Sequence, residues 1–192
     1  MKRIVIFASG SGTNAENLIK FFHNRNDVSI VQVLTNNSRA KVIERCKRLK
    51  VKCVSFNKMD FNESEYVVNL LKRDNTDLIV LAGFLWKIPE SILNAFPNKV
   101  INIHPALLPK YGGKGMYGRR VHQAILDNKE TETGITIHYV NEYYDEGAII
   151  FQEKCLLNAI DTIETIAAKI HDLEMKHFPE VIESLLFPIE NE

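Results

Sequence analysis

Cysteine is scarce in this chain. Only three of its 192 residues are cysteines, at positions 46, 53 and 155. Their odd number, their wide spacing and the lack of a Cys-x-x-Cys pair argue against a disulfide framework and against a structural zinc site. Free thiols of this kind are typical of a reducing compartment, so we expect the protein in the cytoplasm.

Net charge and long apolar runs are also missing. The 24 lysines and arginines balance 24 aspartates and glutamates, so the total charge favours neither nucleic acid nor a membrane surface as a partner. The first apolar run stops at Gly10 and is too short for a secretory signal, and no run approaches the length of a membrane-spanning helix. The histidines show neither a His-x-x-x-His nor a His-Glu-x-x-His spacing, so no metal ion is implied.

What the chain does have is an alternation of short apolar runs and amphipathic segments. With 45% hydrophobic residues it can build one core, and we expect a single domain over residues 1–192. Runs rich in β-branched residues predict strands at 3–8, 29–35, 52–56, 77–84 and 99–104. Apolar residues at helical spacing predict helices at 15–24, 39–50 and 63–74. This order predicts an α/β, Rossmann-like fold with a mostly parallel sheet and helices on both faces.

The pattern changes after Pro109. Residues 110–118 are too glycine-rich for a helix and too irregular for a strand, so they predict a surface loop. The rest of the chain predicts a helix, an antiparallel hairpin and a long C-terminal helix, at 119–128, 133–140 with 147–155, and 161–187. Asp161 to Glu164 has the pattern of a helix cap, and Pro179 is expected to interrupt or kink the last helix.

A glycine-rich loop follows the first predicted strand. The sequence "ASGSGTN", residues 8–14, stands between a strand and a helix, where outward-turned N–H groups and the helix N-terminus can hold a phosphate. Ala15 occupies the place of the third glycine of the dinucleotide fingerprint, so a single phosphate fits better. The alternative is a tight turn in which Asn14 caps the helix.

Two polar residues end the last parallel strand. Asn102 and His104 are two positions apart, so both point to one side of the strand, and Pro105 stops the strand there. An imidazole can move a proton near neutral pH and an amide can donate to an oxyanion, as acyl transfer requires. The alternative is a histidine that caps the strand end, with Asn102 bonded to loop backbone.

Asp145 lies in the acidic turn of the predicted hairpin. Such an aspartate is commonly a solvated turn residue. If the hairpin folds over the sheet edge, Asp145 can hydrogen-bond His104, raise its pKa and orient the ring.

Taken in chain order, the segments "IFASGSGTN", "VLAGF", "INIHPALLPKY" and "YYDEGAII" resemble the folate-dependent formyltransferases, over nearly the whole chain. The N-I-H-P-x-L-L-P motif is specific to proteins that use 10-formyltetrahydrofolate, and G-S-G-T-N in a short chain points to the glycinamide ribonucleotide branch. The resemblance implies a Rossmann-like formyltransferase fold. It also implies that the substrate's primary amine attacks the formyl carbon, giving formylglycinamide ribonucleotide and tetrahydrofolate in purine synthesis.

The resemblance also assigns catalytic roles. Asn102 and a protonated His104 would stabilise the tetrahedral oxyanion, and Asp145 would keep the imidazole charged and help to move the proton from the amine to the leaving nitrogen. No covalent enzyme intermediate and no metal is implied.

Binding roles follow from the same resemblance. The ribonucleotide would be held by Gly12, Thr13, Asn14 and Glu174. The folate would be held by Leu85, Trp86, Lys87, Ile88, Asn102, Asn141, Glu142, Tyr143, Tyr144 and Asp145. The implied partners are these two small molecules, with neither nucleic acid nor a membrane, and the protein is expected as a monomer or a homodimer.

The chain departs from the family pattern in two places. Leu85-Trp86 stands where many members have Met-Arg. The loop that contains Gly112–Gly118 is several residues longer than usual, and beyond it His122 falls on the family's histidine at the start of the next helix. Glycines and Lys114 suggest a mobile lid with extra positive charge.

Other functions share some of these residues. Methionyl-tRNA formyltransferase has the same catalytic trio, but it carries a tRNA-binding domain for which the chain leaves no room. A formyltetrahydrofolate hydrolase would use the trio on water. Sugar-nucleotide N-formyltransferases stay open, because the trio does not identify the amine. A simple nucleotide-binding module would leave the trio unexplained.

Overall fold

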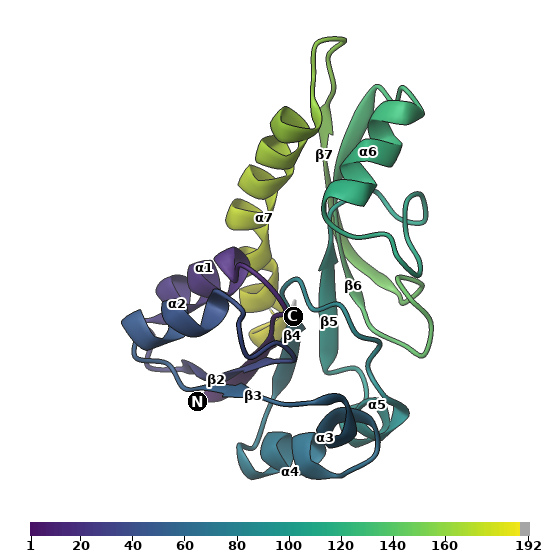
Figure 1. Ribbon diagram of the computed structural model, residues 1–192. Coiled ribbons are helices and arrows are strands. Elements are labelled where there is room, and N and C mark those ends of the chain that lie inside the picture. The colour runs from purple at the N-terminus through teal and green to yellow at the C-terminus, as the bar shows by residue number, and fades with distance from the viewer. Residues whose placement is uncertain (189–192) are drawn as a thin grey trace.

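A seven-stranded sheet runs through the middle of the molecule (Figure 1). The computed structural model describes residues 1–188. Its strands are β1 (Lys2–Phe7), β2 (Val28–Thr35), β3 (Cys53–Ser55), β4 (Leu78–Leu81), β5 (Val100–His104), β6 (Glu132–Tyr139) and β7 (Ile149–Leu156). They lie in the order β3-β2-β1-β4-β5-β6-β7, in which the first five are parallel and β6 is antiparallel to both of its neighbours. The predicted mostly parallel sheet and the antiparallel hairpin are confirmed.

The helices of the described chain are α1 (Thr13–Phe22), α2 (Val42–Arg48), α3 (Lys58–Asn62), α4 (Tyr66–Arg73), α5 (Glu90–Ala95), α6 (Arg119–Asp127) and α7 (Ile163–Leu186). The sequence did not predict α3 and α5. They have five and six residues, which is too short to show a helical period. No helix within residues 1–188 combines the length and the apolar character needed to cross a membrane.

The sheet separates two hydrophobic cores. Alternation along β1 sends Ile4 and Ile6 into the core beneath α1, α2, α6 and α7, and Val5 and Phe7 into the core beneath α3, α4 and α5. Both faces are therefore covered, as the near-continuous apolar strands predicted.

The strand predicted at 77–84 ends early, at Leu81. The chain turns at Gly83, whose φ of 74° is left-handed and is adopted readily by glycine. Because β1, β4 and β5 are neighbours in the sheet, the loops that leave their carboxyl ends meet at one edge. Ligands of open α/β sheets bind at such an edge.

The C-terminal helix α7 continues through Pro179 from Ile163 to Leu186, so of the two outcomes expected there, an interruption or a kink, the interruption does not occur. Proline has no N–H to donate to the carbonyl of Met175, and the side chain of Asn17 in α1 donates to that carbonyl instead. The predicted cap is also shifted by one residue. Thr162 is the N-cap, and it forms a capping box with Thr165.

Candidate active site

Asn102 and His104 lie at the carboxyl end of β5 and face the same pocket. The pocket has a volume of about 650 Å³, which is in the range of small-molecule sites. His104 is buried, with 3% of its surface exposed, and Asn102 is half-buried. The two-residue spacing therefore presents an amide and an imidazole together, as the strand alternation predicted.

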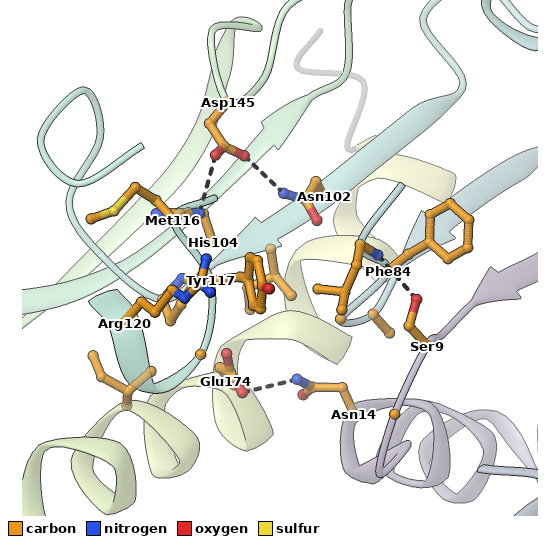
Figure 2. A pocket seen from close by; sticks show the side chains of 18 of the residues that line it. Ser9, Asn14, Phe84, Asn102, His104, Met116, Tyr117, Arg120, Asp145 and Glu174 are labelled. Carbon is orange, nitrogen blue, oxygen red and sulfur yellow. Dashed lines mark hydrogen bonds and ion pairs between the residues drawn. The ribbon is translucent and has the colours of Figure 1, made fainter. Parts of the chain in front are cut away.

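Asp145 joins these two residues from the loop between β6 and β7 (Figure 2). Its Oδ2 lies 3.5 Å from Nδ1 of His104 and accepts a hydrogen bond of 2.9 Å from the N–H of Gly113. Its Oδ1 accepts from Nδ2 of Asn102 at 3.4 Å. The backbone of Asp145 is left-handed, with φ 59°, a conformation that aspartate tolerates better than most residues. The hairpin does fold over the sheet edge, and it brings the three predicted residues together.

The ring of His104 is oriented by a hydrogen bond at Nε2. Nε2 donates to the carbonyl oxygen of Tyr111 at 2.8 Å, which leaves Nδ1 facing Asp145. Burial lowers the pKa of His104 below its usual value, although the charge of Asp145 and the Tyr111 carbonyl act in the opposite direction. Asp145 does act to raise this pKa, as expected, but burial has the larger effect, because one carboxylate 3.5 Å away does not offset the loss of hydration around the ring.

His138 is a further residue of the site, and the sequence did not indicate it. This residue of β6 is opposite Asn102 in the antiparallel ladder and is 2% exposed. Its Nδ1 donates to the carbonyl of Tyr139 at 2.8 Å, and its Nε2 accepts from Nδ2 of Asn102 at 3.1 Å, because the amide nitrogen can only donate. His138 therefore orients the amide whose other hydrogen-bond partner is Asp145. Only the pairing of β5 with β6 reveals this contact, and a pattern within one strand carries no signal of it.

The glycine-rich loop forms the far wall of the pocket. Residues 9–14 all line it, and Gly12, with φ 74°, is the N-cap of α1. Asn14 is inside the first turn of the helix and caps nothing, so the alternative that assigned it a cap is wrong. Its Nδ2 donates instead to Oε2 of Glu174 at 2.9 Å, as Figure 2 shows. Ser9 accepts a 3.0 Å hydrogen bond from the N–H of Leu85, which joins this loop to the one after β4.

Glu174 reaches the pocket from α7. Its side chain is 15% exposed, and burial raises its pKa to about 7 even though the hydrogen bond from Asn14 acts to lower it. Gly12, Thr13, Asn14 and Glu174, the four residues assigned to the ribonucleotide, therefore all line one pocket. A carboxyl group that titrates near neutrality can accept from or donate to a hydroxyl group there.

The residues assigned to the folate divide into two groups. Leu85, Asn102, Tyr144 and Asp145 line the pocket. The others lie outside its lining: Trp86 packs in an aromatic cluster with Phe56, Phe61 and Phe84, Ile88 is buried in the core, and Lys87, Asn141, Glu142 and Tyr143 lie elsewhere on the surface.

The loop before α6 covers one side of the pocket. Residues 113–118 line it, and so do Arg120 and His122 of α6. His122 is 6% exposed, burial lowers its pKa, and its Nδ1 has no hydrogen-bond partner within residues 1–188. The same described part of the chain contains no group of three or more His, Cys, Asp or Glu side chains placed to hold a metal ion.

The profile of one protein family, described as formyl transferase, matches residues 2–182. The chain belongs to this family. Among curated proteins, the phosphoribosylglycinamide formyltransferase of Bacillus subtilis (strain 168) is 36% identical over 193 residues, which cover 97% of this chain and 95% of the relative. The two proteins are therefore similar over nearly their whole lengths, and not only in the motifs.

Solved structures of formyltransferases agree with the fold. The phosphoribosylglycinamide formyltransferase of Bacillus halodurans superposes with a TM-score of 0.86 at 34% identity and covers 99% of this chain and 98% of its own. The glycinamide ribonucleotide transformylase 1 of Geobacillus kaustophilus gives a TM-score of 0.87 at 33% identity, with 97% and 99% covered. The predicted Rossmann-like formyltransferase fold is thereby confirmed.

Proposed function

We propose that this formyltransferase moves the formyl group of 10-formyltetrahydrofolate to the primary amine of glycinamide ribonucleotide (5'-phosphoribosylglycinamide). The products are formylglycinamide ribonucleotide and tetrahydrofolate, in purine synthesis. One observation carries the proposal: Asn102, His104 and Asp145 converge in a pocket whose opposite wall is the loop at the N-terminus of α1. The names of the relatives above support the same substrate.

The loop wall is the proposed phosphate end of the site. Gly12 and Thr13 present backbone N–H groups at the start of α1, where the helix adds partial positive charge. Asn14 and Glu174 lie beside this loop, joined by their hydrogen bond. They are suited to the ribose hydroxyl groups or the amide of the substrate, because together they offer both donors and acceptors.

We propose that formyl transfer takes place at the end of the pocket opposite the phosphate loop. The amine nitrogen forms a bond to the formyl carbon, and the formyl oxygen becomes an oxyanion that the N–H₂ of Asn102 and an imidazolium at His104 stabilise. In the free enzyme burial holds the pKa of His104 low, so we expect the developing negative charge of the intermediate to favour the charged ring.

Proton transfer completes the reaction. The attacking nitrogen becomes positively charged and must lose a proton, and the leaving N10 must gain one as its bond to carbon breaks. Asp145 faces both Asn102 and His104, so its carboxylate is placed to pass this proton as a general base and acid. All bonds and charges balance without a covalent enzyme intermediate.

The folate end is proposed at the loop after β4 and the loop before β7. Leu85 and Tyr144 line the pocket near the catalytic residues. Trp86, Lys87 and Ile88, with Asn141, Glu142 and Tyr143, are proposed to border the folate from outside the pocket lining. The three cysteines of the described residues are free, which agrees with the cytoplasm as the proposed compartment.

The test is the release of tetrahydrofolate from 10-formyltetrahydrofolate by the purified protein, with and without glycinamide ribonucleotide. We expect release only when the ribonucleotide is present, together with a formylated ribonucleotide in equal amount. Release without any amine would instead indicate a hydrolase. Release with an amino-sugar nucleotide alone would replace the proposed acceptor with a sugar nucleotide.

A further inference from the structure

A buried carboxylate lies behind the phosphate loop. Glu16 of α1 is 8% exposed, and its oxygens contact Lys20 at 2.7 Å, Arg48 at 2.6 Å, and Arg45. Hydrogen bonds from Lys20 and Arg45 lower the pKa of Glu16 to about 2, so the carboxylate is charged. These four residues, here called the Glu16 cluster, contain three cations for one anion.

Arg45 also contacts the loop itself. Its Nε donates to the carbonyl oxygen of Ser11 at 2.7 Å, while its Nη1 binds Glu16. One residue of α2 therefore joins the loop to α1. This is the fork geometry that a guanidinium provides and an ammonium does not.

The start of α2 holds the preceding carbonyl in the same way. The N–H of Val42 donates to the carbonyl oxygen of Gly10 at 3.2 Å. The side chain of Val42 packs on Gly12, where an added Cβ would lie 2.6 Å from Cβ of Val42. The carbonyls of Gly10 and Ser11 are thus both turned toward α2.

The direction of these carbonyls sets the direction of the next N–H groups. In a planar trans peptide the C=O of one residue and the N–H of the following residue point to opposite sides. With the carbonyls of Gly10 and Ser11 toward α2, the N–H groups of Ser11 and Gly12 point the other way, and both residues line the pocket. Within residues 1–188 neither N–H donates to a protein acceptor.

We infer that Arg45 is a positioning residue for phosphate binding. It fixes the Ser11 carbonyl to the Glu16 cluster and thereby aims the N–H groups of Ser11 and Gly12 at the phosphate monoester of the substrate. The inference rests on the proposed function, since glycinamide ribonucleotide brings that phosphate. Arg45 acts through the loop backbone and touches no reacting atom.

The chain offers a matched control. Arg48 binds the same carboxylate at 2.6 Å and has the same charge, but its only hydrogen bond in the described chain is to Glu16. Its side chain is 63% exposed. Replacing Arg48 therefore changes the charge of the cluster as replacing Arg45 does, and it leaves the loop carbonyl bonded.

The experiment compares Arg45→Met, Arg45→Lys and Arg48→Met in the full-length protein. Steady-state kinetics give kcat and the two KM values, and titration calorimetry gives the Kd of ribose 5-phosphate. We expect Arg45→Met to raise the KM for glycinamide ribonucleotide and the Kd of ribose 5-phosphate about tenfold, the value of one hydrogen bond to a charged group. The KM for 10-formyltetrahydrofolate and kcat should stay within about twofold, and Arg45→Lys should recover little.

Two results would overturn the inference. In one, Arg45→Met leaves ribose 5-phosphate binding unchanged. In the other, Arg48→Met weakens it as much as Arg45→Met, which would assign the effect to net charge alone. If the wild-type protein releases no tetrahydrofolate with glycinamide ribonucleotide, the proposed function fails, but calorimetry with ribose 5-phosphate still decides the role of Arg45.

Discussion

The side chain of Asn17 in α1 donates a 2.7 Å hydrogen bond to the carbonyl oxygen of Met175 in α7. Met175 is four residues before Pro179, so its carbonyl is the one that the proline leaves without a helical donor. A residue distant in sequence thus supplies the hydrogen bond that α7 lacks, and it fixes α7 against α1. Glu174, the neighbour of Met175, contacts Asn14 across the same helix pair.

The first prediction concerns this bond. Asn17→Ala should lower the free energy of unfolding by about 1–2 kcal/mol, because it leaves a part-buried carbonyl without a donor. Urea unfolding at constant pH measures the change. Formyl transfer should slow only if the loss of this bond also moves Glu174, the neighbour of Met175 in α7.

The control for Asn17 is Pro179→Ala, which restores an N–H to the helix. In the Pro179→Ala protein, Asn17→Ala should lower the free energy of unfolding clearly less than it does in the wild type. The double-mutant cycle should give a coupling energy above roughly 0.5 kcal/mol. Strict additivity of the two changes would show that the Asn17 side chain does not replace the missing helical bond.

The second prediction uses two glycines of one loop. Gly12 has φ 74° and its Cα faces Val42, whereas a Cβ at Gly10 would meet no atom within 4 Å. Gly12→Ala should destabilise the protein by roughly 1–2 kcal/mol from the left-handed backbone alone, with a further cost from the contact with Val42. It should also abolish ribose 5-phosphate binding. Gly10→Ala should melt within about 2 °C of the wild type, and equal melting of both variants would contradict this account.

The sequence predicts the sheet well because each strand carries its own signal. Apolar runs bounded by turn residues mark β1, β2 and β5 within one or two residues, since burial on both faces demands such runs. The short helices α3 and α5 were not predicted, because five or six residues do not complete enough turns to show a helical period. The continuation of α7 through Pro179 could not be predicted, because the hydrogen bond to the carbonyl of Met175 comes from Asn17 of α1, which is far away in the sequence.

The features of the site also differ in whether local sequence spacing or tertiary packing determines them. Asn102 and His104 are separated by a fixed strand spacing, so their common direction could be predicted. The partner of Asn14, the place of His138 beside Asn102, and the balance that sets the pKa of His104 all depend on tertiary packing. Periodicity and motif spacing contain no information about such contacts.

The third prediction concerns the catalytic residues. His104→Asn and Asp145→Asn should each lower kcat by about two orders of magnitude or more, as expected for the loss of a general acid–base group or of oxyanion stabilisation. The KM for glycinamide ribonucleotide should change little, because the phosphate end of the pocket is intact. Single-turnover kinetics on saturated enzyme measures the effect on the chemical step directly.

A thermal melt keeps this result interpretable. Asp145 accepts hydrogen bonds from Gly113 and Asn102, so its replacement also loosens the loop. A variant that melts like the wild type and binds ribose 5-phosphate normally, but turns over at the wild-type rate, would exclude the replaced residue from catalysis.

The fourth prediction concerns Glu174 and pH. Burial raises the pKa of Glu174 from 4.5 to about 7 in the folded protein. Between these two values the folded chain keeps a proton that the unfolded chain has lost, so the folded state binds more protons. The contribution of Glu174 to stability should therefore be full below pH 4.5 and fall as the pH rises toward 7, by roughly 3 kcal/mol at most.

Glu174→Gln isolates this effect, because its amide oxygen can still accept from Asn14 and carries no charge at any pH. Burial lowers the pKa of His104 and of His122, and those shifts make stability rise with pH up to the usual histidine value. Both proteins share His104 and His122, so the difference between their urea midpoints, followed from pH 5 to pH 8, reports Glu174 and its contact with His171, whose Nδ1 lies 4.0 Å from Oε2 of Glu174. Relative to the wild type, the glutamine variant should become more stable as the pH rises toward 7, and the difference should level off above that value. A constant difference over that range would mean that Glu174 is already ionised in the folded protein, and its carboxylate would then act only as an acceptor beside the phosphate loop.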